Sequence, residues 1–563
     1  MTGALRADLP GGVQGPRTRL AALVARASLV DWGIAGGLAL VTLLSRWPYR
    51  ARMLYNWDAV QFALALREFD VAKHQPHPPG YLLYVALARL MNATLADPLL
   101  TYVALSMLFS AGTTLVVYWL ARAIYGRLTA VAASALLAVS PLFWFYGSVG
   151  LTYAGEAFTA SLVALLAWRA LGGSVRHLYL GAVVLGLAGG LRFSVLVLMF
   201  PLWAGAALVG IPSARRLRVA AALLVASVLI WLAPVVWLSG GPGAYLRASA
   251  WLYSLMMVPT SVVSLAPEVT LAQTRYLLES VLVGLGPLAL AFLALPQYVR
   301  RRRWGRPEWF LVGWILPTVA FCTLVHFGQA GYVLTFLPAL VLLLSRALVE
   351  LIGAGSESLR RPHWRRAMTV AALVPLALVN TGFFVSARPE PRDFENRGDE
   401  TWFGAWRWKA RDELHDWIMS RTAAALREHE AVIRTYVESI RALYDPADTA
   451  LLTEMGNPRS YPWVRHAMYY MPEYAIYQIS LDDPPGFYAP QSAVTMFFTP
   501  LRVVTVPSRI KQLVWFVDHW DPAFERPDGL REIALAYGRF LYVLPLDRRP
   551  VQHAGYTFVR EHP

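Results

Sequence analysis

The chain has 563 residues, of which 56% are hydrophobic, and its mean hydropathy is +0.43. Several apolar runs reach the roughly 20 residues that a helix needs to cross a bilayer core, which excludes an ordinary soluble protein. The net charge of +15 comes from arginines clustered between these runs, a pattern typical of cytoplasmic loops, so we expect no nucleic-acid partner.

The hydropathy pattern predicts a polytopic α-helical membrane protein with eleven transmembrane helices. The first apolar run is followed by many others, so we interpret it as a span and not as a cleaved signal peptide. The expected spans are 29–48, 98–120, 128–146, 155–171, 177–191, 193–211, 217–238, 276–296, 308–327, 332–352 and 366–386.

The basic residues indicate the orientation of these spans. The N-terminal segment, 1–28, includes Arg17, Arg19 and Arg26, and every second connection between spans is also basic. By the positive-inside rule this side is the cytoplasm, and the loops 49–97 and 239–275 then lie outside. The basic connections contain Arg122 and Arg127, Arg169 and Arg176, Arg215 to Arg218, Arg300 to Arg306, and Arg360 to Arg366.

Segment 80–96 is apolar enough to be a twelfth span. Counting it as one would place the later arginine clusters on the outer side. We therefore expect a helix that lies in the outer membrane interface.

The composition changes after the last span. The membrane module, 29–386, is followed by residues 387–563, and 24 of the 36 acidic residues lie in this last part. A helix is expected near 405–443, and the segments TALLTEM, AIYQI, RVVTV and RFLYVLPL have the composition of strands. The sequence predicts a C-terminal extracytoplasmic α/β domain, which we suggest selects the acceptor.

Asp58 is the first candidate catalytic residue. It follows Tyr55 and Trp57 directly after the first span, so it should lie at the membrane surface among aromatic rings. A carboxylate near the hydrocarbon boundary is costly unless it is paired or solvated, which makes it a functional candidate. The alternatives are a solvated loop residue or a helix N-cap.

The loop after Asp58 gathers further polar groups ahead of a Pro-Pro-Gly turn. Two prolines stiffen this turn, and Gly80 permits close backbone approach. Each polar group could instead be an ordinary exposed residue, and the HxxH spacing alone is weak support for a metal. The candidate residues here are Asp70, Lys73, His74, His77 and Tyr81.

Other polar residues are expected at the outer ends of later spans. Glu156 could supply a second carboxylate or could simply begin a helix. Arg192, Arg247 and Arg275 are candidates for binding phosphate, because guanidinium groups bind phosphate with two parallel hydrogen bonds. His326 and Gln329 lie at an outer turn and could line the same cavity.

These residues carry a resemblance to a known family. The Asp58 position, a short following helix and the His77-Pro-Pro-Gly-Tyr81 turn resemble the first external loop of GT-C glycosyltransferases. The protein O-mannosyltransferase and aminoarabinose-transferase group is the most similar. The segments LVVYWLARAIYG, SPLFWFYG and GYVLTFLPAL are also similar to family segments. The resemblance covers roughly residues 30–350.

The resemblance implies an inverting transferase that moves a sugar from a polyprenyl-phosphate carrier to an acceptor at the outer membrane face. The acceptor could be a glycan, a lipid or a protein. Asp58 matches the family's general base, and His77 matches the position near the donor phosphate or a metal. Many relatives carry a second acid at the Gln75–His77 turn; this chain does not, which leaves a divalent metal ion open.

The resemblance divides the candidate residues by role. Asp58 is the catalytic residue. The donor-phosphate candidates are His77, Lys73, Arg192, Arg247 and Arg275. The candidates for the substrate cavity are Tyr55, Trp57, Asp70, His74, Tyr81, Glu156, His326 and Gln329.

Two other classes of function are alternatives. A transporter or flippase of a lipid-linked substrate usually shows internal repeats and ionisable residues at the bilayer midplane. This sequence shows no repeat, and its ionisable residues gather at one surface. A non-catalytic assembly factor would use the C-terminal domain to bind a partner and would tolerate changes at Asp58.

Overall fold

The computed structural model describes most of the membrane module and most of the C-terminal domain. The described ranges are 29–301, 304–354, 362–387, 421–455, 464–481, 486–491, 499–517, 520, 524–546 and 550–561. The expected N-terminal segment, 1–28, and the linker after residue 387 lie outside them. So does the first part of the helix expected near 405–443.

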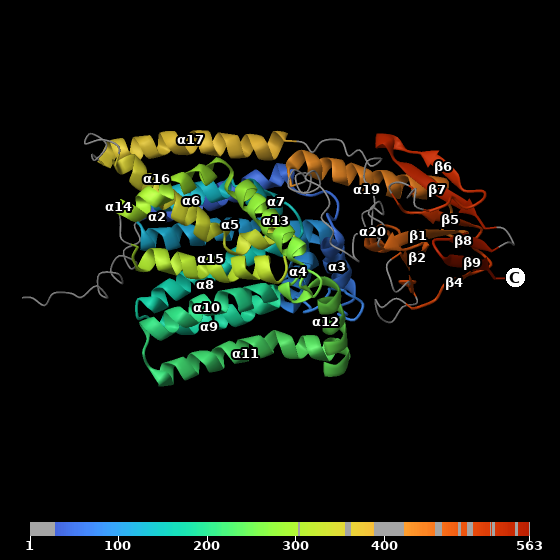
Figure 1. Cartoon of the computed structure of the whole chain (residues 1–563), viewed down its shortest axis with the longest axis horizontal. Helices are drawn as coiled ribbons and strands as arrows, with labels where there is room; N and C mark the ends of the chain where they lie inside the picture. Colours follow the sequence, from blue (N-terminus) through green and yellow to red (C-terminus); the bar gives the residue numbers. More distant parts are fainter. Residues whose placement is uncertain are drawn as a thin grey trace, which may run out of the picture.

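The membrane module is a bundle of long helices that run side by side (Figure 1). Among the described residues, eight helices are long and apolar enough to cross a membrane. In chain order the elements are α2 (Leu29–Arg46), η1 (Trp47–Tyr49), α3 (Trp57–Arg67), α4 (Leu82–Leu95), α5 (Pro98–Ile124), α6 (Arg127–Ala138), α7 (Pro141–Tyr146), α8 (Tyr153–Leu171), α9 (Val175–Leu191), α10 (Phe193–Gly210), α11 (Ala214–Leu238), α12 (Pro242–Met256), η2 (Val262–Ser264), α13 (Pro267–Leu285), η3 (Gly286–Ala294), α14 (Leu295–Arg301), α15 (Arg306–Leu324), η4 (Ala330–Thr335), α16 (Leu337–Ala354) and α17 (Pro362–Ser386).

Three expected spans are not single regular helices. The span expected at 128–146 is divided into α6 and α7, because the Ser140 side chain caps a new helix that begins with Pro141. The span at 276–296 begins earlier, at Pro267, and changes to a 3₁₀ helix at Gly286, whose φ is +56°. The span at 332–352 is divided into η4 and α16. Hydropathy does not reveal these breaks, because the apolar composition continues across each of them.

One end of the bundle gathers the basic connections. Asp31, at the start of α2, is buried and pairs with Arg127 at 2.6 Å and with Arg122 at 3.3 Å. Arg306 donates a hydrogen bond to the Leu171 carbonyl, which joins two further basic connections. These contacts join the start of α2 to the connection between α5 and α6, and the connection between α8 and α9 to the one before α15.

The opposite end of the bundle faces the C-terminal domain (Figure 1). The helices α3, α4 and α12 lie at this end. The short helix expected after Asp58, over residues 59–69, forms as α3, which begins at Trp57 and so includes Asp58. The segment expected at 80–96 forms the 14-residue helix α4. Its placement in the membrane interface stays a prediction.

The C-terminal domain is a mixed α/β unit, and all four expected strands are confirmed. A six-stranded sheet has the order β3-β2-β1-β5-β7-β6, with β2, β1 and β5 parallel, and a second sheet has the order β4-β9-β8. Its elements are α19 (Ala423–Leu443), β1 (Thr449–Met455), α20 (Val464–Tyr470), β2 (Ala475–Ser480), β3 (Gly486–Tyr488), β4 (Val503–Val506), β5 (Gln512–Trp515), β6 (Arg531–Ala534), η7 (Ala536–Gly538), β7 (Phe540–Pro545), β8 (Val551–His553) and β9 (Tyr556–Arg560).

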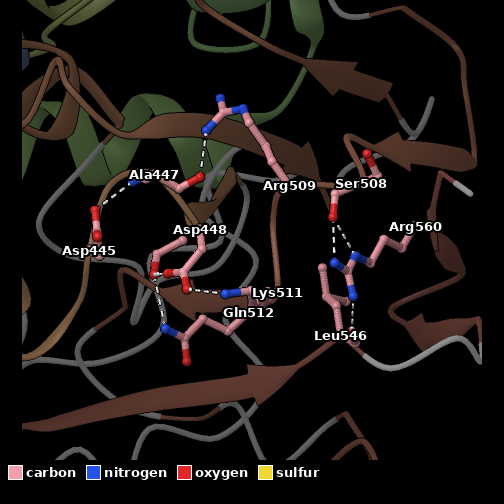
Figure 2. A network of polar contacts seen from close by, with 10 residues as sticks. Asp445, Ala447, Asp448, Ser508, Arg509, Lys511, Gln512, Leu546 and Arg560 are labelled. Carbon is pink, nitrogen blue, oxygen red and sulfur yellow. Dashed lines mark hydrogen bonds and ion pairs between the residues drawn. The ribbon is translucent and has the colours of Figure 1, made fainter. Parts of the chain in front are cut away.

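A network of polar contacts ties together the loops at one edge of this domain (Figure 2). Lys511 Nζ lies 3.2 Å from Asp448 Oδ2, and Arg509 donates to the Ala447 carbonyl. Arg560, at the end of β9, donates through Nε to the Ser508 carbonyl at 2.8 Å. These contacts join the start of β1 to the loop before β5 and to the second sheet.

The C-terminal domain is fastened to the short segment 50–57, which leads into α3. Helices α19 and α20 contact this segment mostly through its backbone. Five hydrogen bonds do this: Arg427 to the Arg50 carbonyl at 2.6 Å, the Arg52 amide to Glu430 at 2.5 Å, the Leu54 amide to Tyr470 at 2.8 Å, His466 Nε2 with the Leu54 carbonyl at 3.2 Å, and His429 Nε2 with the Tyr55 carbonyl. The domain therefore fixes the main chain just before Asp58.

His466 makes this attachment sensitive to acid. Burial lowers the pKa of His466 from 6.5 to about 4. An unfolded chain would bind the proton first, so the unfolding free energy should fall as the pH drops from 6.5 towards 4, by on the order of 3 kcal/mol. Detergent-denaturation curves at several pH values measure this, with His466→Gln as the comparison. Equal pH slopes for the two proteins would contradict the assignment.

Candidate active site

Asp58 lies in the first turn of α3. Asn56, not Asp58, caps this helix, because its side chain accepts the Ala59 amide at 3.1 Å. The Asp58 carboxylate is left to face the loop, 3.6 Å from His77 Nδ1, and it accepts a hydrogen bond from Gln329 Nε2 at 3.3 Å. The helix start, His77 and Gln329 hold the carboxylate in place. The Asp58 side chain is 23% exposed, so a substrate can still reach it.

His77 is held in one tautomer by two neighbours. Its Nδ1 lies 2.7 Å from Gln61 Oε1, and its Nε2 lies 3.0 Å from the Tyr81 hydroxyl. An amide oxygen only accepts, so Nδ1 carries the proton and Nε2 accepts from Tyr81. Burial lowers the pKa of His77; Asp58 opposes this, and the positive charge of Arg192 adds to it. His77 is therefore neutral at pH 7.

The turn between His77 and α4 depends on Gly80. Its φ is +106°, a region that disfavours side chains, and a Cβ here would lie 2.8 Å from Val235 Cγ1 on α11 and 3.2 Å from Val71 Cγ2. The expected close approach of the backbone is therefore found. It seats the turn against α11 and so places the His77 ring.

Gly80→Ala should destabilise the folded protein by about 2–4 kcal/mol, from a strained φ and a clash with Val235. Gly126 is the matched control, because its φ is +97° but no atom of the described residues lies within 4 Å of the point where a Cβ would stand. Gly126→Ala should cost only about 1–2 kcal/mol. Detergent denaturation measures both variants, and equal losses would contradict the role of the close approach.

Glu156 and Arg192 form a buried ion pair beside this group. Glu156, in the first turn of α8, lies 2.5 Å from Arg192 Nε, and Arg192 Nη1 donates to Thr152 at 2.7 Å. The guanidinium also lies over the rings of Tyr153, at 4.1 Å, and Tyr332, at 5.0 Å. Arg192 thus brings a positive charge close to His77, while Glu156 neutralises it.

The loop between α15 and η4 adds a further contact to this group. Its Gln329 is the residue that donates to Asp58. His326 lies close by in sequence, and its Nδ1 is 2.9 Å from the Thr260 hydroxyl. Burial lowers the pKa of His326 to about 4, so this ring is neutral. Gln329 thus contacts the Asp58 carboxylate directly, and the role of this turn in lining a substrate cavity stays a prediction.

Several candidates from the first loop have structural partners instead. Asp70 closes its own turn by accepting the Ala72 amide at 2.8 Å. Lys73 pairs with Glu68 at 2.6 Å on the surface, where the hydrogen bond from Lys73 to Glu68 raises the pKa of Lys73. His74 is buried against Trp251 of α12. Neither Asp70 nor Lys73 makes a described contact with Asp58.

The two arginines expected after residue 239 also lie apart from Asp58. Arg275 pairs with Glu279 one turn along α13, at 2.8 Å, and it is 46% exposed. Arg247 is exposed on α12. Within the described ranges, neither has a contact with the Asp58 group. Their role in phosphate binding stays a prediction.

Tyr55 and Trp57 lie at the junction with the C-terminal domain. The Tyr55 hydroxyl accepts a hydrogen bond from Arg421 at 2.8 Å, and the Arg465 guanidinium lies 5.2 Å from the Trp57 ring centre. Sequence analysis missed both arginines, because no local pattern distinguishes them from other arginines of the domain. It also missed Gln61, which lies three residues after Asp58 and so shares its helix face.

A metal site built from protein side chains alone, such as a zinc site, needs at least three converging ligands. No group of three or more His, Cys, Asp or Glu side chains that could hold a metal occurs in the described part of the chain. Glu156, the expected second carboxylate, is committed to Arg192, and the His77 nitrogens contact Gln61 and Tyr81. The expected protein ligands are thus paired with other side chains, and a divalent ion held partly by a substrate phosphate stays a prediction.

The fold identifies the class to which this arrangement belongs. The chain is similar to ArnT from Cupriavidus metallidurans bound to undecaprenyl phosphate, with a TM-score of 0.51 and 15% identity over 80% of this chain and 86% of that one. The membrane module with its C-terminal domain therefore has the GT-C fold of membrane glycosyltransferases.

A sequence match points to one family within this class. Residues 58–210 match the model described as "Protein O-mannosyl-transferase TMEM260 N-terminal domain". This range begins at Asp58 and includes His77, Glu156 and Arg192. A search of curated proteins finds no match.

Other solved structures are similar at lower scores. The apo state of the same ArnT matches with a TM-score of 0.46 and 14% identity, over 82% of this chain and 86% of that one. The oligosaccharyltransferase AglB from Archaeoglobus fulgidus, in complex with an inhibitory peptide and a dolichol-phosphate, matches with a TM-score of 0.39 and 15% identity. This last match covers 63% of this chain and 56% of that one.

Proposed function

We propose that the protein transfers a sugar from a polyprenyl-phosphate carrier to an acceptor hydroxyl at the outer face of the membrane, with inversion at the anomeric carbon. The observation that carries the proposal is the Asp58 carboxylate, partly exposed and held between His77 and Gln329 at the end of the bundle. ArnT, which has the same fold, is described bound to undecaprenyl phosphate, and this supports a lipid-linked donor.

The reaction is a single displacement. The acceptor oxygen attacks the anomeric carbon while the bond from that carbon to the phosphate oxygen breaks. Asp58 accepts the hydroxyl proton, and the polyprenyl phosphate leaves with the bonding electrons. A positioned base of this kind contributes about 10²–10⁴-fold to the rate.

The neighbours of Asp58 hold it in a place that suits a base. Neutral His77 directs its Nδ1 proton towards Gln61 and the carboxylate side of the loop, and Gln329 donates to one carboxylate oxygen. Gln329 is therefore the donor to the carboxylate, whereas Gln61 accepts the Nδ1 proton of His77. Arg192, held by Glu156 and two tyrosine rings, is the cation that we assign to the leaving phosphate.

The test is a donor panel. The full chain in lipid nanodiscs would receive labelled polyprenyl-phosphate sugars with a mixture of hydroxyl acceptors. Consumption of one donor, and product with the anomeric configuration opposite to that donor, would support the proposal. Failure to consume any donor while one is moved across a sealed vesicle membrane would favour a flippase instead.

A further inference from the structure

Helix α20 of the C-terminal domain inserts an arginine between the two halves of the loop that carries Asp58 and His77. Arg465 is fully buried. Its guanidinium carbon lies 5.2 Å from the ring centre of Trp57, and its Nη2 donates to the Lys73 carbonyl at 2.9 Å. One side chain from the last part of the sequence thus touches both the start of α3 and the turn before His77.

The two contacts of Arg465 are next to the reacting groups. Trp57 directly precedes Asp58, and Lys73 lies four residues before His77. The separation of the Asp58 carboxylate and His77 Nδ1, 3.6 Å, therefore depends on the same two segments that Arg465 joins. An arginine suits this position, since its planar guanidinium can stack on an aromatic ring while its N–H groups donate to a carbonyl.

We propose that Arg465 is a positioning residue for the transfer reaction: it bridges Trp57 and the Lys73 carbonyl and so sets how Asp58 faces His77. The inference rests on the proposed function of the Asp58 site. It assigns the C-terminal domain a part in assembling the catalytic loop, beyond any selection of the acceptor.

The positive charge of Arg465 provides a second test of the bridge, through its effect on the pKa of His77. Arg465 and Arg192 both lower the pKa of His77, after burial, while Asp58 raises it. His74 and Tyr81 are the other titratable groups near this ring. A protonated His77 would pair with the Asp58 carboxylate, 3.6 Å away, and weaken it as a base. Removal of the Arg465 charge should raise the pKa of His77, so the acid limb of the kcat profile should move to higher pH.

The experiment compares Arg465→Gln and Arg465→Lys with wild type in nanodiscs, as the full chain. The kcat should fall about 10²-fold in Arg465→Gln, with the KM for donor changed less than about 3-fold, because misplacement of a base affects the transition state. Arg465→Lys keeps the positive charge but loses the planar guanidinium that both stacks on Trp57 and donates to the Lys73 carbonyl. The kcat should therefore fall about 10-fold, and the acid limb of the kcat profile should stay in place.

Tyr470→Phe is the matched control. It removes the hydrogen bond from the Leu54 amide, and so loosens the domain attachment, without touching Trp57 or Lys73. The kcat of this variant should stay within about 3-fold of wild type. An equal loss in Tyr470→Phe and Arg465→Gln would mean that Arg465 only holds the domain on, and would overturn the inference.

Hydrogen exchange of peptides covering residues 57–77 separates this inference from the proposed function. Faster exchange is expected in Arg465→Gln than in wild type, whichever donor the protein uses. Unchanged exchange, or wild-type kcat in either Arg465 variant, would overturn the bridge and leave the glycosyltransferase proposal standing. If wild type consumes no donor, the exchange data alone decide the bridge, and the proposed function fails separately.

Discussion

Asp58→Asn is expected to lower the rate of sugar transfer about 10²–10⁴-fold while donor binding is retained. Asparagine has the same shape, and its side-chain oxygen can still accept from Gln329, so the cavity should keep its form. What the amide cannot do is take a proton from the acceptor hydroxyl. Single-turnover transfer from a saturating labelled donor measures the loss at the chemical step.

The control for this variant is Asp97→Asn. Asp97 caps α5 by accepting the Leu100 amide at 3.1 Å, and asparagine is an equally good cap. The Asp97→Asn variant makes the same change from carboxylate to amide outside the Asp58 group, so its transfer rate should match wild type. A rate near wild type for Asp58→Asn would remove the general base from the mechanism.

Glu156→Ala is expected to cost about 3–5 kcal/mol of stability, because it leaves the buried Arg192 guanidinium without its counter-ion. The two side chains are only 0% and 7% exposed, so water cannot compensate. The double variant Glu156→Leu with Arg192→Met should recover most of this loss, since it removes both charges. Transfer activity of the double variant should stay low, as it lacks the cation assigned to the phosphate.

Glu279→Gln is the matched control for the ion pair. Its partner Arg275 is 46% exposed, and an exposed pair contributes only about 0–1 kcal/mol. Detergent denaturation of the three variants and wild type gives the comparison. A loss in Glu156→Ala no larger than in Glu279→Gln would show that the buried pair does not stabilise the bundle.

The local part of the site could be predicted from sequence because it lies in one loop. Asp58 and His77 are separated by 19 residues, and a short helix and a proline turn bring them face to face. The spans followed from hydrophobicity. The breaks within the spans did not follow from it, although Ser140-Pro141 is a typical helix start and Gly286 a typical helix end.

The rest of the site depends on contacts that no local pattern specifies. Glu156 and Arg192 were both candidates, but their pairing follows from how α8 packs near the start of α10. Lys73 and Asp70 have the residue types of a phosphate or cavity site, yet nearby groups in the same loop satisfy them. Arg421 and Arg465 reach the first loop from positions 366 and 392 residues away.

The hydrogen bonds that join α19 and α20 to the loop around Asp58 have a consequence for biosynthesis. The bonds from Leu54 to Tyr470 and from Arg465 to Lys73 join residues 416 and 392 positions apart. At about 5–20 residues per second, a ribosome needs on the order of 20–80 s to make the intervening chain. The loop that carries Asp58 is therefore made well before the residues that hold it, and we expect it to gain these contacts only after helix α20 has been synthesised.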